Sequence, residues 1–149
     1  AMDLVGRKLR KDGGEEMRAL ISDLNDINVL AKAASSDGEG DLTICMNALS
    51  AGIETLSTAT DVMLNANDVD ALAVASPYLT LCANVLSGAL LIKAVANGLN
   101  AGDKHAKVMA NLARYHALSI MPAASAQLDF IRAGADPVFN FPIGQLADL

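Results

Sequence analysis

The sequence predicts an all-α protein, specifically an antiparallel up-down four-helix bundle with a short irregular C-terminal tail. Three observations lead to this fold class. The chain is 52% hydrophobic but only 3% aromatic, and its commonest residue is alanine, which has the highest helix propensity. The β-branched and aromatic residues that strands favour are scarce. Long stretches carry apolar residues at spacings of three and four, the period of an amphipathic helix.

The length and charge of the chain limit what it can be. Its 149 residues suggest one domain, in which about 70% of the unfolded surface can be buried. A net charge of −6 disfavours nucleic acid and anionic membrane surfaces, because binding to both depends on lysine and arginine. Two cysteines are too few for a disulfide framework, and we see no signal-peptide pattern. We therefore expect a cytoplasmic protein whose partners include neither nucleic acid nor a membrane.

The first two helices of the bundle are predicted at 14–35 and at about 42–66. The loop between them, 35–41, is rich in Gly, Ser and Asp, which favour turns, and Asp41 is expected to cap the second helix. The sequence "NAND" at 65–68 ends that helix. The apolar stripes are Met17, Leu20, Leu24, Ile27, Ala31 and Ala34 in the first helix, and Leu42, Cys45, Leu49, Ile53, Leu56, Thr60 and Met63 in the second.

Ser76 and Pro77 interrupt the third helical region, which covers about 69–100. Proline lacks an N–H and costs about 3 kcal/mol in a helix interior. One solution is a short helix over 69–75, followed by a second helix that Ser76 caps with Pro77 at its first position. The other is a single long helix with a kink. The sequence leaves both open.

The fourth helix is predicted from near Asp103 to about Ala133. Pro122 lies inside it, so we expect a bend around residues 119–122. Gly134 fits the left-handed position that ends many helices. The tail, 135–149, is expected to be an ordered arm or a short irregular segment.

The run from Ala71 to Ile92 carries no charge and is long enough to span a bilayer. Polar residues interrupt the run, and much of its apolar character comes from alanine. A buried bundle helix accounts for it equally well, and we favour that interpretation.

Neither histidine fits a metal-binding or catalytic motif. Di-iron bundles use Glu-x-x-His pairs, and neither His105 nor His116 has an acidic residue three positions earlier. The two lie roughly 16 Å apart along one helix, so they cannot bind the same ion. We expect His105 to be solvated in the first turn of its helix and His116 to be a packed or surface residue.

The cysteines and carboxylates also give no predicted site. Cys45 and Cys82 are expected on neighbouring helices with an offset of roughly 10 Å, too far for a disulfide, and we predict buried, inert thiols. Glu54 and Asp61 share a helix face, where solvated carboxylates are commoner than an acid–base pair. A solvated, frayed segment is favoured over a phosphate site for the basic residues near the start of the chain, which are Arg7, Lys8, Arg10 and Lys11.

Three stretches carry a resemblance to a known family. The opening "AMDLVGRKL", residues 1–9, is similar to the end of the motif "YEGTNGIQALDLVGRKL" of large acyl-CoA dehydrogenases. "YLTLCANVLSGALLIKAV" at 78–95 and "ANLARYHALSIMPAASAQLDFIRAGAD" at 110–136 resemble the extra C-terminal domain found in one subgroup of these flavoenzymes. The 3-methylmercaptopropionyl-CoA dehydrogenase-like enzymes belong to that subgroup.

The resemblance implies an incomplete enzyme. In the family, the glutamate of "YEGT" removes the α-proton of an acyl-CoA, and FAD takes the hydride and passes electrons to electron-transfer flavoprotein. Residues 1–12 would be the end of the catalytic domain and residues 13–149 the C-terminal helical bundle domain. The catalytic glutamate and nearly all FAD contacts would lie upstream. We therefore assign no catalytic, cofactor-binding or metal-ligating residue to this chain, and FAD only to the parent enzyme.

Three functions follow as hypotheses. The first is a C-terminal domain or fragment of an FAD-dependent acyl-CoA dehydrogenase, docked on the catalytic domain in cis or in trans. The second is a stand-alone interaction or scaffolding bundle derived from that family, and the third is a small-molecule carrier. A homo-oligomer is also expected, because the first segment needs cover for its apolar side, which consists of Met2, Leu4, Val5 and Leu9.

Overall fold

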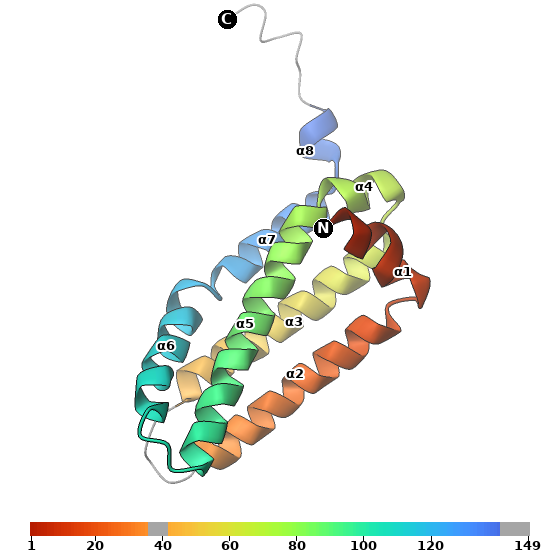
Figure 1. Ribbon diagram of the computed structural model, residues 1–149. Helices are drawn as coiled ribbons and strands as arrows, with labels where there is room; N and C mark the ends of the chain where they lie inside the picture. Colours follow the sequence, from red (N-terminus) through yellow and green to blue (C-terminus); the bar gives the residue numbers. More distant parts are fainter. Residues whose placement is uncertain (36–41, 141–149) are drawn as a thin grey trace, which may run out of the picture.

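The described parts of the chain form helices joined by short turns, which confirms the all-α class (Figure 1). The computed structural model describes residues 1–35 and 42–140. The elements in chain order are the π-helix η1 (Leu4–Lys8), α1 (Leu9–Lys11), α2 (Glu15–Ala34), α3 (Thr43–Asn65), α4 (Asp68–Ala73), α5 (Ala75–Asn100), α6 (Ala106–Ser119), α7 (Ala123–Ala133) and α8 (Asp136–Phe139).

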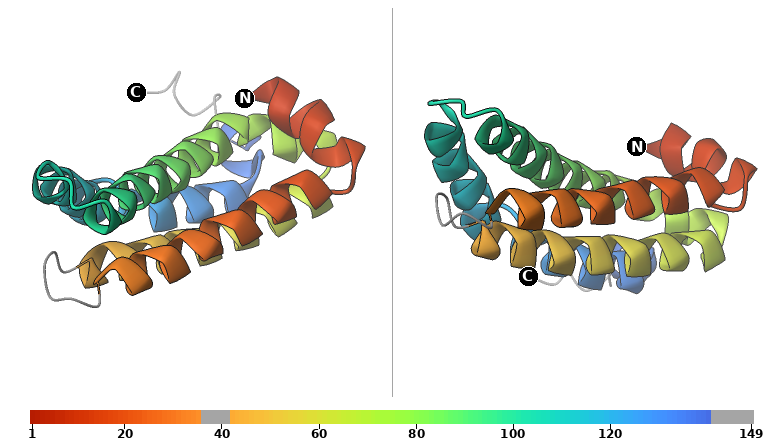
Figure 2. Two further views of the ribbon diagram at one scale, coloured as in Figure 1. Left: turned by 60° about the horizontal axis from the view of Figure 1, so that its bottom comes forward. Right: turned by 90° about the horizontal axis from the view of Figure 1, so that it is seen from below.

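In the view of Figure 1, the middle helices α3 and α5 lie between α2 on one side and α6 and α7 on the other, and Figure 2 shows the same helices from two further sides. Helix α2 packs against both on one side, and α6 and α7 pack against both on the other. Leu49 and Leu56 of α3 and Leu81 and Val85 of α5 are almost completely buried. Their spacings of seven and four residues place each pair on one helix face, so the core forms where the apolar stripes meet.

The predicted bounds of α2 and α3 agree with the structure to within one residue at each end. Asp12 caps α2, because its carboxylate accepts hydrogen bonds from the backbone N–H groups of Gly14 and Glu16, both at 2.9 Å. These bonds, that from Glu16 foremost, stabilise the charged form and lower the pKa of Asp12. The predicted cap Asp41 and all of the predicted loop except Ser35 lie outside the described residues.

The third region is divided as in the first of the two predicted solutions. Helix α4 ends at Ala73, Val74 separates the helices, and α5 begins at Ala75. The predicted capping role of Ser76 is wrong, because the chain turns earlier and Val74 takes the cap position. Pro77 is therefore the third residue of α5. Its missing N–H breaks no bond there, because the first four N–H groups of a helix have no partner within it.

The predicted bend in the fourth region is confirmed. The N–H groups of Ile120 and Met121 both donate to the carbonyl of His116, at 2.9 and 3.1 Å, and α7 starts after Pro122. Two backbone donors that share one acceptor cannot both continue an α-helical ladder. The chain therefore changes direction between α6 and α7, and α6 begins at Ala106 rather than near Asp103.

Gly134 ends α7, but not in the predicted left-handed conformation. Its φ is +63° as expected, whereas its ψ is −139°. Asp70 of α4 explains the difference, because its Oδ1 accepts a hydrogen bond from the N–H of Ala135 at 2.9 Å. A Cβ on Gly134 would lie 2.7 Å from the same oxygen. Glycine therefore allows the end of α7 to approach α4.

The beginning of the tail is helical rather than irregular. Residues Asp136–Phe139 form α8, with Pro137 at a position whose N–H needs no helical partner. Residues 141–149, the remainder of the predicted tail, lie outside the described part.

The first segment is packed rather than frayed. Val5 and Leu9 are 1% and 4% exposed, and η1 contacts α4 and α5. Arg10 donates from Nη2 to the carbonyl of Ala66 at 2.7 Å and forms an ion pair with Asp68. A cation at the C-terminal end of α3 is favourable to the helix dipole. The predicted solvated state is therefore wrong for Arg10, and the apolar side of this segment is largely covered within the chain.

Exposed basic residues remain in the same segment. Arg7 pairs with Asp3 at 2.8 Å, and Lys8 approaches the same carboxylate at 3.6 Å. Both pairs are on the surface, where such ion pairs contribute little to stability. Lys11 is exposed as well.

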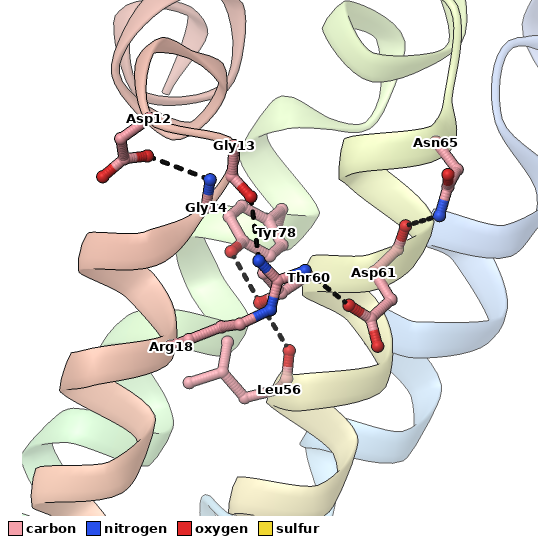
Figure 3. Close-up of polar contacts among 9 residues, drawn as sticks. All are labelled: Asp12, Gly13, Gly14, Arg18, Leu56, Thr60, Asp61, Asn65 and Tyr78. Atoms are coloured by element: carbon pink, nitrogen blue, oxygen red, sulfur yellow. Dashed lines mark hydrogen bonds and ion pairs between the residues drawn. The ribbon is translucent and has the colours of Figure 1, made fainter.

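A buried hydrogen bond connects the two middle helices (Figure 3). Thr60 of α3 donates its hydroxyl proton to the carbonyl of Leu56 at 2.7 Å. The Thr60 oxygen also lies 2.9 Å from the hydroxyl of Tyr78, which is 0% exposed. Because Thr60 has one proton and it is already used, Tyr78 is the donor in this pair. Burial is the main cause that raises the pKa of Tyr78.

This donor order predicts unequal effects of two conservative substitutions. Tyr78→Phe removes a donor and leaves the Thr60 bond to Leu56 intact, so we expect a loss of about 0.5–1.5 kcal/mol in the free energy of unfolding. Thr60→Val leaves the buried Tyr78 hydroxyl without its oxygen acceptor, and the loss should be larger, about 1–3 kcal/mol. Urea denaturation followed by circular dichroism measures both, and a larger loss for Tyr78→Phe would contradict the assignment.

Candidate functional site

The residues considered as catalytic or metal-binding candidates do not converge. Within residues 1–35 and 42–140, no group of three or more His, Cys, Asp or Glu side chains is placed to hold a metal ion. Glu54 is exposed, and Asp61 is exposed and lies 3.4 Å from Arg18 of α2 (Figure 3). These two carboxylates therefore sit on a solvated face of α3, as predicted.

The two histidines differ in environment. His105 is exposed and occupies the position just before α6. His116 is only 9% exposed, and its Nε2 lies 2.9 Å from the hydroxyl of Ser87 on α5. Its Nδ1 is buried and has no hydrogen-bond partner. Burial lowers the pKa of His116, because desolvation disfavours the charged imidazolium.

The space beside His116 is tightly packed. A Cβ on Gly88 of α5 would lie 3.1 Å from both Cε1 and Nδ1 of His116 and 3.3 Å from the Met121 sulfur. A Cβ on Gly52 of α3 would lie 2.4 Å from the Met121 methyl carbon. Met121, at the bend between α6 and α7, therefore contacts glycine positions on both middle helices.

Neither Cys45 nor Cys82 forms a disulfide. Cys45 is buried and Cys82 is half-buried. Desolvation raises the pKa of Cys82 to about 11. A thiol with such a pKa is a poor nucleophile near neutral pH, because the thiolate is the reactive form. The prediction of buried thiols without a disulfide is confirmed for Cys45, whereas Cys82 is only half-buried.

Two hollows border α3, and their dimensions can be compared with those of ligand sites. A cavity of about 210 Å³ lies at the bend beside α3, and it is lined mainly by Ala, Gly and Met side chains. This volume is below the 300–1,000 Å³ that is typical of small-molecule sites, so it does not favour a carrier. A groove of about 550 Å³ lies between α3 and α7. Its lining includes Asp61, Asp70 and Arg132, and these charges do not form one complementary set for a ligand.

The most distinctive surface is the outer side of α5. Leu79, Leu86 and Leu90 are 41%, 37% and 55% exposed, and their spacings of seven and four place them in one row. Ala83 and Ala94 are also exposed and extend this row. We call these five residues the α5 face. No charged residue occurs in α5 before Lys93, so the row lacks the charges that normally cover an exposed helix.

Sequence reasoning missed the α5 face, although it noticed the uncharged run. The prediction assigned the run to a helix buried in the bundle. In the structure, α5 is the helix among the described residues that is long and apolar enough to cross a membrane, and one side of it stays uncovered. Exposed Val108, Leu112 and Tyr115 on the neighbouring α6 add to the apolar surface of this part of the molecule.

The described parts therefore form an all-helical domain with an exposed apolar face on α5 and without a group of side chains placed to hold a metal ion. Residues 15–142 match the protein family described as acetyl-CoA dehydrogenase C-terminal like. The match covers most of the length of the chain, and the chain therefore belongs to this family. Neither the curated proteins nor the solved structures gave a match.

The contact of Gly88 with His116 predicts non-additive effects. Alanine is the better helix former by about 1 kcal/mol, but at position 88 its methyl group would press on the buried imidazole. We expect Gly88→Ala to lower the free energy of unfolding by about 1 kcal/mol through overpacking. In a His116→Ala background the same change should be neutral or stabilising. A double-mutant cycle in urea measures the coupling, and additive effects would contradict the contact.

The raised pKa of Cys82 predicts slow alkylation. At pH 8 its thiolate fraction should be roughly 0.1%, so iodoacetamide should modify folded Cys82 roughly 100-fold more slowly than the same residue in urea. The rate should rise about tenfold per pH unit up to pH 10. Mass spectrometry of the Cys82 peptide measures this. Equal rates in folded and unfolded chains would show that burial does not protect the thiol.

Proposed function

We propose that this chain is the C-terminal helical domain, or a fragment carrying it, of an FAD-dependent acyl-CoA dehydrogenase. In this proposal it has a structural docking role and no complete active site of its own. The match of residues 15–142 to the family supports the assignment. The resemblance of residues 1–12 to the end of the catalytic domain supports a boundary at 12–13, and the family match begins shortly after it.

The observation that carries the docking role is the α5 face. An uncharged row of leucine and alanine on an exposed helix is typical of a surface that another protein body covers. Burying a leucine side chain completely contributes about 1.5–3 kcal/mol, so covering the exposed parts of three leucines is a substantial driving force. We propose the catalytic domain of the acyl-CoA dehydrogenase as the body that covers this face, in cis or in trans.

Several finer assignments belong to the same proposal. We propose membership of the 3-methylmercaptopropionyl-CoA dehydrogenase-like subgroup, on the motifs at 78–95 and 110–136. We also propose that α2, α3, α5 and the bent pair α6–α7 are best classified as an antiparallel up-down four-helix bundle. The parent enzyme would be a cytoplasmic homo-oligomer that holds FAD through its catalytic domain. In this proposal the first segment does not form the contact between subunits, because its Val5 and Leu9 side chains are buried within this chain.

One observation, the α5 face, also supports a second function. A stand-alone interaction or scaffolding bundle would need an exposed apolar surface as well, and the α5 face would serve it equally. Sequencing the DNA upstream separates the two. An open reading frame that continues into a sequence like "YEGTNGIQ" supports the domain of an acyl-CoA dehydrogenase. A ribosome-binding site directly before Met2 supports the independent protein.

The docking role predicts a specific loss of binding. We expect the purified chain to be colourless, to reduce no dye with acyl-CoA, and to bind the separately purified catalytic domain from the same reading frame. Leu86→Glu places a charge in the α5 face and should weaken that binding at least tenfold, about 1.4 kcal/mol. Calorimetric titration measures the affinity.

Val29→Glu is the matched control for this experiment, because Val29 is the one large hydrophobic residue of α2 that is exposed, at 70%. It should leave the affinity unchanged. A yellow chain with dehydrogenase turnover would refute the absence of an active site. Unchanged binding by the Leu86→Glu variant would refute the α5 face as the docking surface.

A further inference from the structure

His116 lies between α6 and α5, in surroundings that favour the neutral imidazole over the imidazolium ion. It lies in α6, and its ring contacts Ser87 and Gly88 of α5 and is close to Met121 at the bend. The hydroxyl of Ser87 donates its proton to the carbonyl of Asn84 at 3.1 Å. Because a serine hydroxyl has one proton, Ser87 must accept from Nε2–H of His116. In the neutral imidazole the proton is therefore on Nε2.

This tautomer leaves Nδ1 as a bare acceptor in the interior. Nδ1 has no partner, and a Cβ on Gly88 would lie only 3.1 Å from it. Leaving a neutral ring nitrogen without a partner lowers the stability of the fold only modestly. Adding a proton there creates a buried charge and a donor without an acceptor, which costs considerably more.

The described groups that face the ring carry no charge. They are Ser87 and Gly88 from α5 and Met121 from the bend, and none of them titrates near neutral pH. Burial is the cause that lowers the pKa of His116. Arg114 of α6 is exposed.

We propose that His116 is a proton-sensitive clamp, which holds α6 against α5 while the imidazole is neutral and releases it when Nδ1 takes up a proton. The released state lets Nδ1 reach water, so the proton binds that state more tightly. Acidification therefore shifts the chain toward opening of α6 and the bend. This inference is independent of the family assignment and of the docking role.

The sign of the pH effect follows from linkage. The pKa of His116 is lower in the folded chain than in the unfolded chain. The stability that neutral His116 adds to the fold is therefore fully present above the unfolded pKa of about 6.5. It is lost as the pH falls below that value, until the folded-state pKa is reached. The closing equilibrium constant should decrease by up to tenfold for each pH unit in this window.

The test compares the wild-type chain with His116→Gln, whose amide can still donate to Ser87 but does not titrate. Urea unfolding between pH 7.5 and 5 gives the unfolding constant of each, and hydrogen exchange of α6 amides at matched pH gives the local opening. We expect the wild type to lose stability relative to His116→Gln as the pH falls below about 6.5. His105→Gln, which changes the chain's one other histidine, should keep the wild-type pH dependence.

A second measurement keeps the proposal testable if His116→Gln does not fold. The chain has two histidines, so the ring resonance that remains in His105→Gln belongs to His116 and can be followed by NMR in the folded chain. We expect it to titrate at lower pH than histidine in the urea-unfolded chain. An ordinary or raised titration midpoint in the folded chain would overturn the clamp, as would parallel pH profiles for the wild type and His116→Gln.

Discussion

Helix α5 packs against α2, α3, α6 and α7. Each of these helices therefore buries part of its apolar face against α5. Such packing requires a helix that carries no charge over most of its circumference and that permits close approach on more than one side. Gly88 and Ala89 meet the second requirement, because small side chains let neighbouring backbones come near. Tyr78, near the start of the same helix, supplies volume and one hydrogen bond to α3.

The glycine positions on α3 and α5 also decide how the last third of the chain is arranged. Met121 is a flexible side chain that fills irregular gaps well, and it lies against Gly52 and Gly88 at the point where α6 gives way to α7. Pro122 interrupts the helix, and the packing of Met121 against Gly52 and Gly88 holds the bend at this position. The turn of the backbone and the tertiary packing thus act at the same residues.

Much of the fold was predictable because its signals are local. The stripes of α2 and α3 are long and periodic, which located both helices to within one residue, and Pro77 and Pro122 marked the two interruptions. The errors involve contacts between distant residues. Arg10 reaches the carbonyl of Ala66, and Asp70 shapes the end of α7, across separations of 56 and 65 residues. No local pattern contains that information.

The candidate surfaces show the same division between local and distant information. The α5 face could not be read from the uncharged run alone, because the sequence does not show which side of this helix its neighbours cover. Packing within the chain accounts for the absence of charge on the sides of α5 that meet its neighbours. It does not account for the row formed by Leu79, Leu86 and Leu90, which the described residues leave exposed. That remaining row is why the proposed function rests on α5 rather than on any titratable residue.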